Sequence, residues 1–194
     1  MKYNIHTYNK TVGIVLLLFT FVLNSTAQDK GNFGIKLGAN YMSPYFPTHI
    51  EKVGFQGGFF SSIQIYKPVS LQIEMLFSQQ GYEEESNGEW SYTINTNYFE
   101  IPLIAQFKII EPVSLYAGGQ LGFRSDLEVV KSENYRVVSE PQEPDEFVLS
   151  SLGGVALNHG RWGMDLRYII GFNPSKEHTA NMSGLKWFVT YAFK

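Results

Sequence analysis

The stretch at residues 69–82, VSLQIEMLFSQQGY, alternates apolar and polar residues. The apolar positions are Val69, Leu71, Ile73, Met75 and Phe77, and Glu74 stands in the middle of the polar set, with Leu76 as the one exception. Because successive side chains of a strand point to opposite faces, this alternation predicts a β-strand with two unlike faces. Its length is close to the roughly 9–11 residues with which a tilted strand crosses a bilayer.

Seven further segments alternate in the same way, at residues 32–41, 53–66, 98–108, 113–124, 147–158, 162–172 and 184–194. The connections are alternately long and short, with short turns at 67–68, 109–112 and 159–161. In an up-and-down sheet, all the short turns then lie at one end. This pattern predicts an all-β fold, an eight-stranded antiparallel up-and-down transmembrane β-barrel. Pro102 cannot donate to a ladder, so we expect an edge or a bulge there.

A soluble barrel with an apolar cavity would show the same alternation. Several features favour the membrane barrel, the first being strands that are long and similar in length. Only 17% of residues are charged, below the roughly 25% of soluble domains. The polar face consists mostly of Gly, Ser, Gln and Asn, and aromatic residues fall near strand ends, as in interfacial girdles. The net charge of −3 and the lack of a basic run argue against a nucleic-acid partner.

Residues 1–27 have the features of a secretory signal peptide: Lys2 and Lys10, an apolar run at 12–23, and small residues before Gln28. The run is too short for a spanning helix, which needs about 20 residues. We therefore expect cleavage of residues 1–27, residues 28–194 as an outer-membrane β-barrel domain, and a place among the lipids of the bacterial outer membrane. The chain has no cysteine and thus no disulfide framework.

Four segments, LQIEMLFSQQG, YFEIPLIAQF, LYAGGQLGF and DLRYIIGF, resemble in this order the strand motifs of the PorT-like outer-membrane β-barrel family. These are porin-family proteins of Bacteroidetes-type bacteria, with small barrels similar to OmpX and OmpA. The resemblance covers roughly residues 31–194. It implies an eight-stranded, non-enzymatic outer-membrane barrel, and one member of the family is linked to protein secretion. Lys194 after Phe193 departs from the family's aromatic C-terminus.

The polar face carries seven charged residues: Lys36, Glu74, Glu100, Arg124, Asp165, Arg167 and Lys186. The lumen of an eight-stranded barrel is just wide enough for side chains to fill, and buried charges there need partners. We predict a salt-bridge network that holds the lumen shut, with Glu74 paired to Arg167 or Lys36. A narrow ion path is the alternative. Glu74 and Glu100 could resemble an acid–base pair. Because Arg167 is available as a partner, we expect no catalytic residue. No motif predicts a cofactor or a metal site.

The predicted external loops at 83–97, with a possible extension of the strands into its ends, and at 125–146 are acidic and together carry a charge of −9. Long loops on a rigid barrel are where binding residues usually lie. Candidate anchors for an envelope or extracellular protein partner are Trp90, Tyr92 and Tyr135, and candidates for a cation or cationic partner are Glu143, Asp145 and Glu146. The sequence predicts a non-enzymatic barrel with a structural, adhesive or partner-binding role. A narrow porin-like channel and an accessory barrel of a secretion system are the alternatives.

Overall fold

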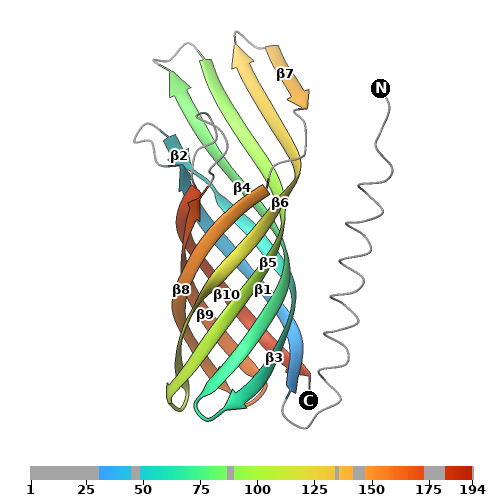
Figure 1. Ribbon diagram of the computed structural model, residues 1–194. Coiled ribbons are helices and arrows are strands. Elements are labelled where there is room, and N and C mark those ends of the chain that lie inside the picture. The colour runs from blue at the N-terminus through green and yellow to red at the C-terminus, as the bar shows by residue number, and fades with distance from the viewer. Residues whose placement is uncertain are drawn as a thin grey trace, which may run out of the picture.

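The computed structural model describes residues 31–44, 49–86, 90–133, 136–141, 147–172 and 182–193. Eight long strands close into an antiparallel barrel, in which β1 pairs with both β3 and β10 (Figure 1). They are β1 (Gly31–Pro44), β3 (Val53–Tyr66), β4 (Val69–Ser86), β5 (Trp90–Ile110), β6 (Val113–Glu133), β8 (Phe147–His159), β9 (Trp162–Phe172) and β10 (Met182–Phe193). The predicted eight-stranded up-and-down barrel is confirmed. Within the described residues, no helix is long and apolar enough to cross a membrane.

The three short turns lie together at one end of the barrel. Each turn accepts a backbone hydrogen bond from an adjacent strand, namely β5, β8 and β10. The amide of Lys108 donates to the carbonyl of Pro68 at 3.0 Å, and that of Asn158 to Pro112 at 2.9 Å. The amide of Ala192 donates to the carbonyl of Arg161 at 2.8 Å. The last turn contains Gly160 at φ 64°, a backbone conformation that glycine adopts without steric cost.

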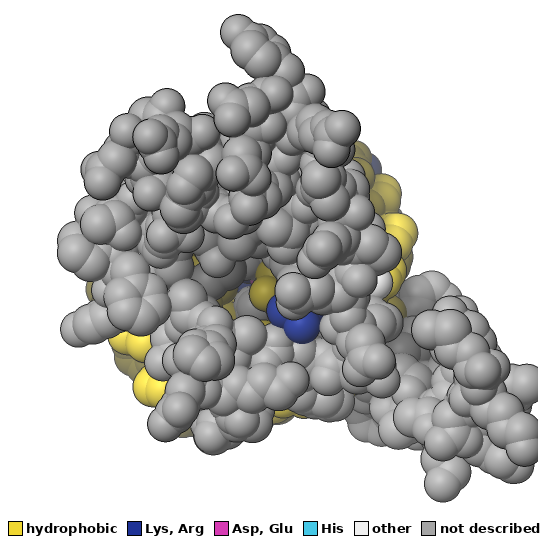
Figure 2. Space-filling model, turned by 90° about the horizontal axis from the view of Figure 1, so that it is seen from above, with side chains coloured by type: hydrophobic (Ala, Val, Ile, Leu, Met, Phe, Trp, Pro, Cys, Tyr) yellow, Lys and Arg dark blue, Asp and Glu magenta, His cyan; other side chains and the backbone are white. Residues whose placement is uncertain are grey.

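The outer face of the barrel is apolar. Exposed and buried residues alternate along all 11 residues of β9, where the exposed set is Trp162, Met164, Leu166, Tyr168, Ile170 and Phe172. Exposed large apolar side chains also lie on the other barrel strands, among them Phe55, Leu103 and Leu185. Some of these apolar side chains are visible at the periphery of the barrel seen from above (Figure 2). An apolar surface this continuous is far larger than soluble monomers expose. It is the surface that a lipid bilayer would cover.

The lumen is more apolar than the sequence predicted. Leu76 faces it and is 2% exposed, and a cluster of buried residues lies with it on the inner face: Met42, Ile104, Tyr116, Leu152, Ala156 and Ile169. Large lumen side chains stand opposite glycines, as Phe60 does opposite Gly34 and Tyr116 opposite Gly154. A Cβ on Gly34 would lie 2.6 Å from the Phe60 ring. These glycines make room for the aromatic rings in a narrow barrel.

Pro102 lies neither at an edge nor at a bulge, so this expectation was wrong. The β4–β5 ladder pairs Ile73 with Leu103 and Leu76 with Glu100 in one constant register, and only the two positions between them are unpaired. On its other side, Pro102 pairs with Gln120 of β6. The missing N–H therefore interrupts one ladder locally, opposite Glu74, while the surrounding pairs hold the strand in place.

Much of the predicted loop at 83–97 and part of that at 125–146 are strands. Residues 82–86 of β4, 90–94 of β5 and 126–133 of β6 continue beyond the barrel wall (Figure 1). Two short strands flank them, β2 (His49–Glu51) on β4 and β7 (Arg136–Pro141) on β6. We call these five segments the projecting sheet. Its many acidic residues indicated a loop, whereas the β-branched and aromatic residues between them favour strands.

Candidate functional site in the lumen

The first feature of the lumen is a cluster of four buried charges. Glu74 on β4 accepts two hydrogen bonds from the Arg167 guanidinium on β9, both at 2.9 Å, and one from Lys36 Nζ on β1 at 2.7 Å. Lys36 also forms an ion pair with Asp165, which accepts from Arg167 Nη2 at 3.3 Å. Two cations and two carboxylates thus make a neutral cluster across the lumen. A two-pronged contact of this kind fixes the orientation of the guanidinium.

Neutral side chains complete the coordination of this four-charge cluster. Tyr116 donates its hydroxyl to Asp165 Oδ1 at 3.0 Å, and Gln72 donates to Glu74 Oε1 at 2.6 Å. The Phe188 ring lies 4.5 Å from Lys36 Nζ and 4.6 Å from Arg167 Cζ. Cations are attracted to the face of an aromatic ring, the more so when shielded from water. Both cations are therefore held between carboxylates and ring faces.

A second neutral cluster pairs Lys186 on β10 with Glu100 on β5. Lys186 Nζ lies 2.7 and 2.6 Å from the two carboxylate oxygens of Glu100. Gln80 donates to Glu100 at 2.9 Å and to Ser78 Oγ at 3.2 Å, and Asn40 donates to the same hydroxyl at 3.2 Å. In the β1–β10 ladder Asn40 pairs with Lys186. This cluster therefore connects β1 and β10 on one side of the lumen with β4 and β5 on the other.

Arg124 is the remaining charge on the predicted lumen face. Arg124 is half-buried on β6 and pairs with Tyr98 of β5. Gly122, two residues before Arg124, pairs with Glu100. Arg124 therefore stands closer to the projecting sheet than the Glu100–Lys186 pair does. Basic side chains are visible in the central opening when the barrel is seen from that end (Figure 2).

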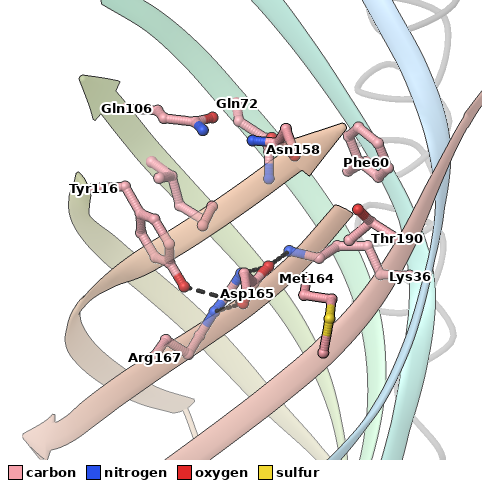
Figure 3. Close-up of a pocket in the computed structure, with 12 residues that line it drawn as sticks. Lys36, Phe60, Gln72, Gln106, Tyr116, Asn158, Met164, Asp165, Arg167 and Thr190 are labelled. Atoms are coloured by element: carbon pink, nitrogen blue, oxygen red, sulfur yellow. Dashed lines mark hydrogen bonds and ion pairs between the residues drawn. The ribbon is translucent and has the colours of Figure 1, made fainter. Parts of the chain in front are cut away.

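A cavity of about 40 Å³ lies beside the four-charge cluster. Its lining includes Lys36, Phe60, Tyr116, Asp165 and Arg167, and Figure 3 shows Lys36, Tyr116 and Arg167 converging on Asp165. A space of this size holds only one or a few water molecules. It is too small for an organic substrate.

The chemistry of the two clusters is that of a plug. Each carboxylate accepts from a cation, so neither Glu74 nor Glu100 is left free to act as a general acid or base. In the part of the chain that the structure describes, no group of three or more His, Asp or Glu side chains has the spacing of a metal site. The arrangement supports a filled lumen rather than a reaction centre.

Sequence reasoning placed the charges on the lumen face but did not select their neutral partners. The alternation in residues 113–124 places Tyr116 on the polar face, but it does not indicate that Tyr116 contacts Asp165 or that Phe188 contacts the two cations. Both stand at lumen positions opposite a glycine of the neighbouring strand, Gly154 and Gly38, and this pairing is visible only in the folded sheet. Of the candidate loop residues, Tyr135, Glu143, Asp145 and Glu146 lie outside the described residues. Trp90 and Tyr92 have a described backbone, in β5, but no described side chain.

Comparison with protein-family models matches residues 19–177 to the outer membrane protein beta-barrel domain. The chain belongs to this family. Among solved structures, Ail, the attachment invasion locus protein of Yersinia pestis, has 16% identity and a TM-score of 0.50, over 84% of this chain and 98% of that chain. Neisserial surface protein A has 14% identity and a TM-score of 0.55, over 84% and 97%. At such identities the likeness establishes the fold alone. Comparison with curated proteins gives no significant match.

The protein is therefore an outer-membrane β-barrel of the bacterial cell envelope. In barrels of this kind the short turns face the periplasm and the long connections face outward. We accordingly expect the projecting sheet on the external side. Membership of the PorT-like subfamily and cleavage of residues 1–27 remain predictions.

Proposed function

We propose that this barrel is non-enzymatic and presents the projecting sheet to a positively charged protein outside the cell. The observation that carries the proposal is the sheet itself. Past the barrel wall the β4–β5 ladder continues in one register, and the β5–β6 ladder continues after a register shift between Asn97 and Tyr98. β2 and β7 extend the sheet on both sides. A lipid-spanning barrel does not need this extension for closure. A rigid external platform, in contrast, reduces the ordering cost of binding a partner.

Charge defines the class of partner. The five segments of the projecting sheet contain eight acidic residues and two basic residues, a net charge of −6. The acidic ones are Glu51, Glu83, Glu84, Glu85, Asp126, Glu128, Glu133 and Glu140. Such a surface speeds encounter with a cationic partner and repels an anionic one. One solved structure of Ail is a complex with the heparin analogue sucrose octasulfate. The charge of the projecting sheet argues against a sulfated ligand for this chain.

The lumen supports the binding role over the channel alternative. Two neutral ion-pair clusters and a layer of apolar side chains fill it. Separating such an ion pair is energetically costly, because it leaves each charge buried without its partner. We therefore expect no conductance from the purified barrel in planar bilayers, whereas a steady single-channel current would favour the porin-like alternative.

The binding role is tested with a nine-residue oligoarginine peptide as the probe. The folded full-length barrel should bind this peptide, and binding should weaken strongly between low and physiological salt. The triple variant Glu83→Gln, Glu84→Gln, Glu85→Gln should bind several-fold more weakly. Glu111→Gln, which removes an acid at the opposite end of the barrel, is the matched control and should bind like the parent.

Equal binding by the triple variant and the parent would refute the role of the projecting sheet. Pull-down from intact cells, with the same variant beside the parent, then identifies the natural partner. The secretion-accessory alternative predicts instead a co-purifying envelope complex and a secretion defect on deletion. Export through a signal peptide at residues 1–27 is tested by sequencing the N-terminus of the mature protein.

A further inference from the structure

A second charged surface lies at the opposite end of the barrel. At or next to each of the three short turns, a basic residue is adjacent in sequence to an exposed aromatic one. The pairs are Tyr66–Lys67, Phe107–Lys108 and Arg161–Trp162, and the aromatic side chains are 63%, 51% and 61% exposed. We call the residues at 66–68, 107–112 and 159–162 the periplasmic rim. Backbone hydrogen bonds tie the three turns to neighbouring strands, so these ties do not depend on the side chains of the pairs.

Arg161 shows how such a pair is built. Its Nη1 donates to the Tyr191 hydroxyl at 3.3 Å, and the Tyr191 ring packs edge to face on Trp162 with 4.9 Å between centroids. This hydrogen bond uses one of the five donors of a guanidinium. The remaining donors suit a phosphate group, which guanidinium groups bind in two-pronged fashion. Arg161 is exposed, so the site is open to the membrane interface.

The rim is positively charged, in contrast to the projecting sheet. Among its described residues Lys67, Lys108 and Arg161 are basic, and Glu111 is the one acid. Glu111 forms an ion pair with Lys108, whose side chain nevertheless stays 51% exposed. The two ends of the barrel thus carry opposite charge, and anionic groups are favoured at the periplasmic one.

We propose that the periplasmic rim binds anionic phospholipids of the inner leaflet through their headgroup phosphates. Aromatic side chains of membrane proteins settle at the level of the lipid headgroups, with their rings toward the acyl chains. A basic group beside each ring lies at the same depth as the lipid phosphates. Free phosphate shares the charge but makes no contact with the exposed rings, so the paired arrangement selects the lipid. This proposal is independent of the projecting sheet and its partner.

The test uses tryptophan quenching at the rim. Replacing Trp90 and Trp187 by phenylalanine leaves Trp162, beside Arg161, as the one emitting tryptophan. The full-length barrel is placed in phosphatidylcholine vesicles that contain brominated phosphatidylglycerol or brominated phosphatidylcholine at equal mole fraction. A basic residue at an anionic surface contributes an affinity of about fivefold. Brominated phosphatidylglycerol should therefore quench Trp162 more strongly, with an apparent local preference of about fivefold that Arg161→Gln abolishes.

Controls separate the rim from other sources of preference. Lys52→Gln removes one positive charge near the other end of the barrel and should leave the preference unchanged. A barrel that retains Trp187 alone reports lipid on the middle of the wall and should show equal quenching by both lipids. Heat-modifiable migration on gels verifies that each variant is folded.

Equal quenching of Trp162 by both lipids would overturn the proposal, as would an undiminished preference in Arg161→Gln. Loss of the preference in millimolar inorganic phosphate at constant ionic strength would assign the site to free phosphate and overturn it as well. Native mass spectrometry gives a second reading, since the parent should retain more phosphatidylglycerol than the triple variant Lys67→Gln, Lys108→Gln, Arg161→Gln.

Discussion

Replacing Glu74 by glutamine removes the carboxylate that Arg167 and Lys36 share. The variant leaves two buried cations against the single carboxylate of Asp165, a net charge of +1 in a cluster that was neutral. Arg167→Gln produces the opposite imbalance. Unit charges about 4 Å apart interact by ~4 kcal/mol at an effective dielectric constant of 20. Removing one partner of a buried pair typically costs about 3–5 kcal/mol, and we expect each single variant to lose that much unfolding free energy.

The double variant Glu74→Gln, Arg167→Gln should be less destabilised than the sum of the single effects. It restores neutrality, because Lys36 and Asp165 remain as a pair. The expected cost of the double variant is close to that of one single variant. The loss of unfolding free energy in the double variant should therefore be about 3 kcal/mol smaller than the sum of the two single losses, and this difference is the coupling energy.

The measurement is reversible unfolding of the barrel in urea with lipid vesicles, followed by circular dichroism and heat-modifiable migration. Lys108→Gln, which breaks the exposed Lys108–Glu111 pair, is the control and should leave stability almost unchanged. Single effects that add within about 0.5 kcal/mol would show that Glu74 and Arg167 do not interact, and would refute the plug as described.

Three further predictions concern the wall and the turns. Gly154→Ala should destabilise the barrel by about 1–3 kcal/mol in the same unfolding assay, because the added Cβ would lie 2.6 Å from the Tyr116 hydroxyl oxygen. Leu166→Arg places a charge on the lipid face near the middle of β9 and should cost about 2–4 kcal/mol in bilayers, with little change if the face met water. The hydrogen bond from Lys108 lowers the pKa of the Glu111 carboxyl from 4.5. The stabilising effect of this ion pair is therefore present at neutral pH and is lost as the pH falls through the folded pKa. In an NMR titration, Lys108→Gln should move the pKa of Glu111 back toward 4.5.

Strand ends at the short turns were predictable, whereas those at the long connections were not. Proline and glycine fix the backbone of the turns at Pro68, Pro112 and Gly160, and the predicted strands begin within two residues of them, at Val69, Val113 and Trp162. At the other end, clusters of acidic residues interrupt the alternation at 83–85 and 126–133. There strand pairing with a neighbour outweighs local composition, and pairing is not visible in one segment alone.

The lumen charges illustrate the same limit. Alternation placed Glu74 and Arg167 on the inner face, but they are 93 residues apart in the sequence. Several cations share that face, among them Lys36 and Lys186. The choice among them depends on the stagger of the strands around the closed barrel, which sets the height of each side chain in the lumen.

The sequence by itself determined the two-faced strands, their number and the end at which the short turns gather. These follow from the two-residue period of a strand and from turn chemistry, both of which are local. Only the tertiary structure decided that Glu74 binds Arg167 and Lys36 together while Glu100 binds Lys186, and that aromatic rings fill the space left by glycines on the neighbouring strand. Closure of the barrel brings these residues together, and closure is a property of all eight strands at once.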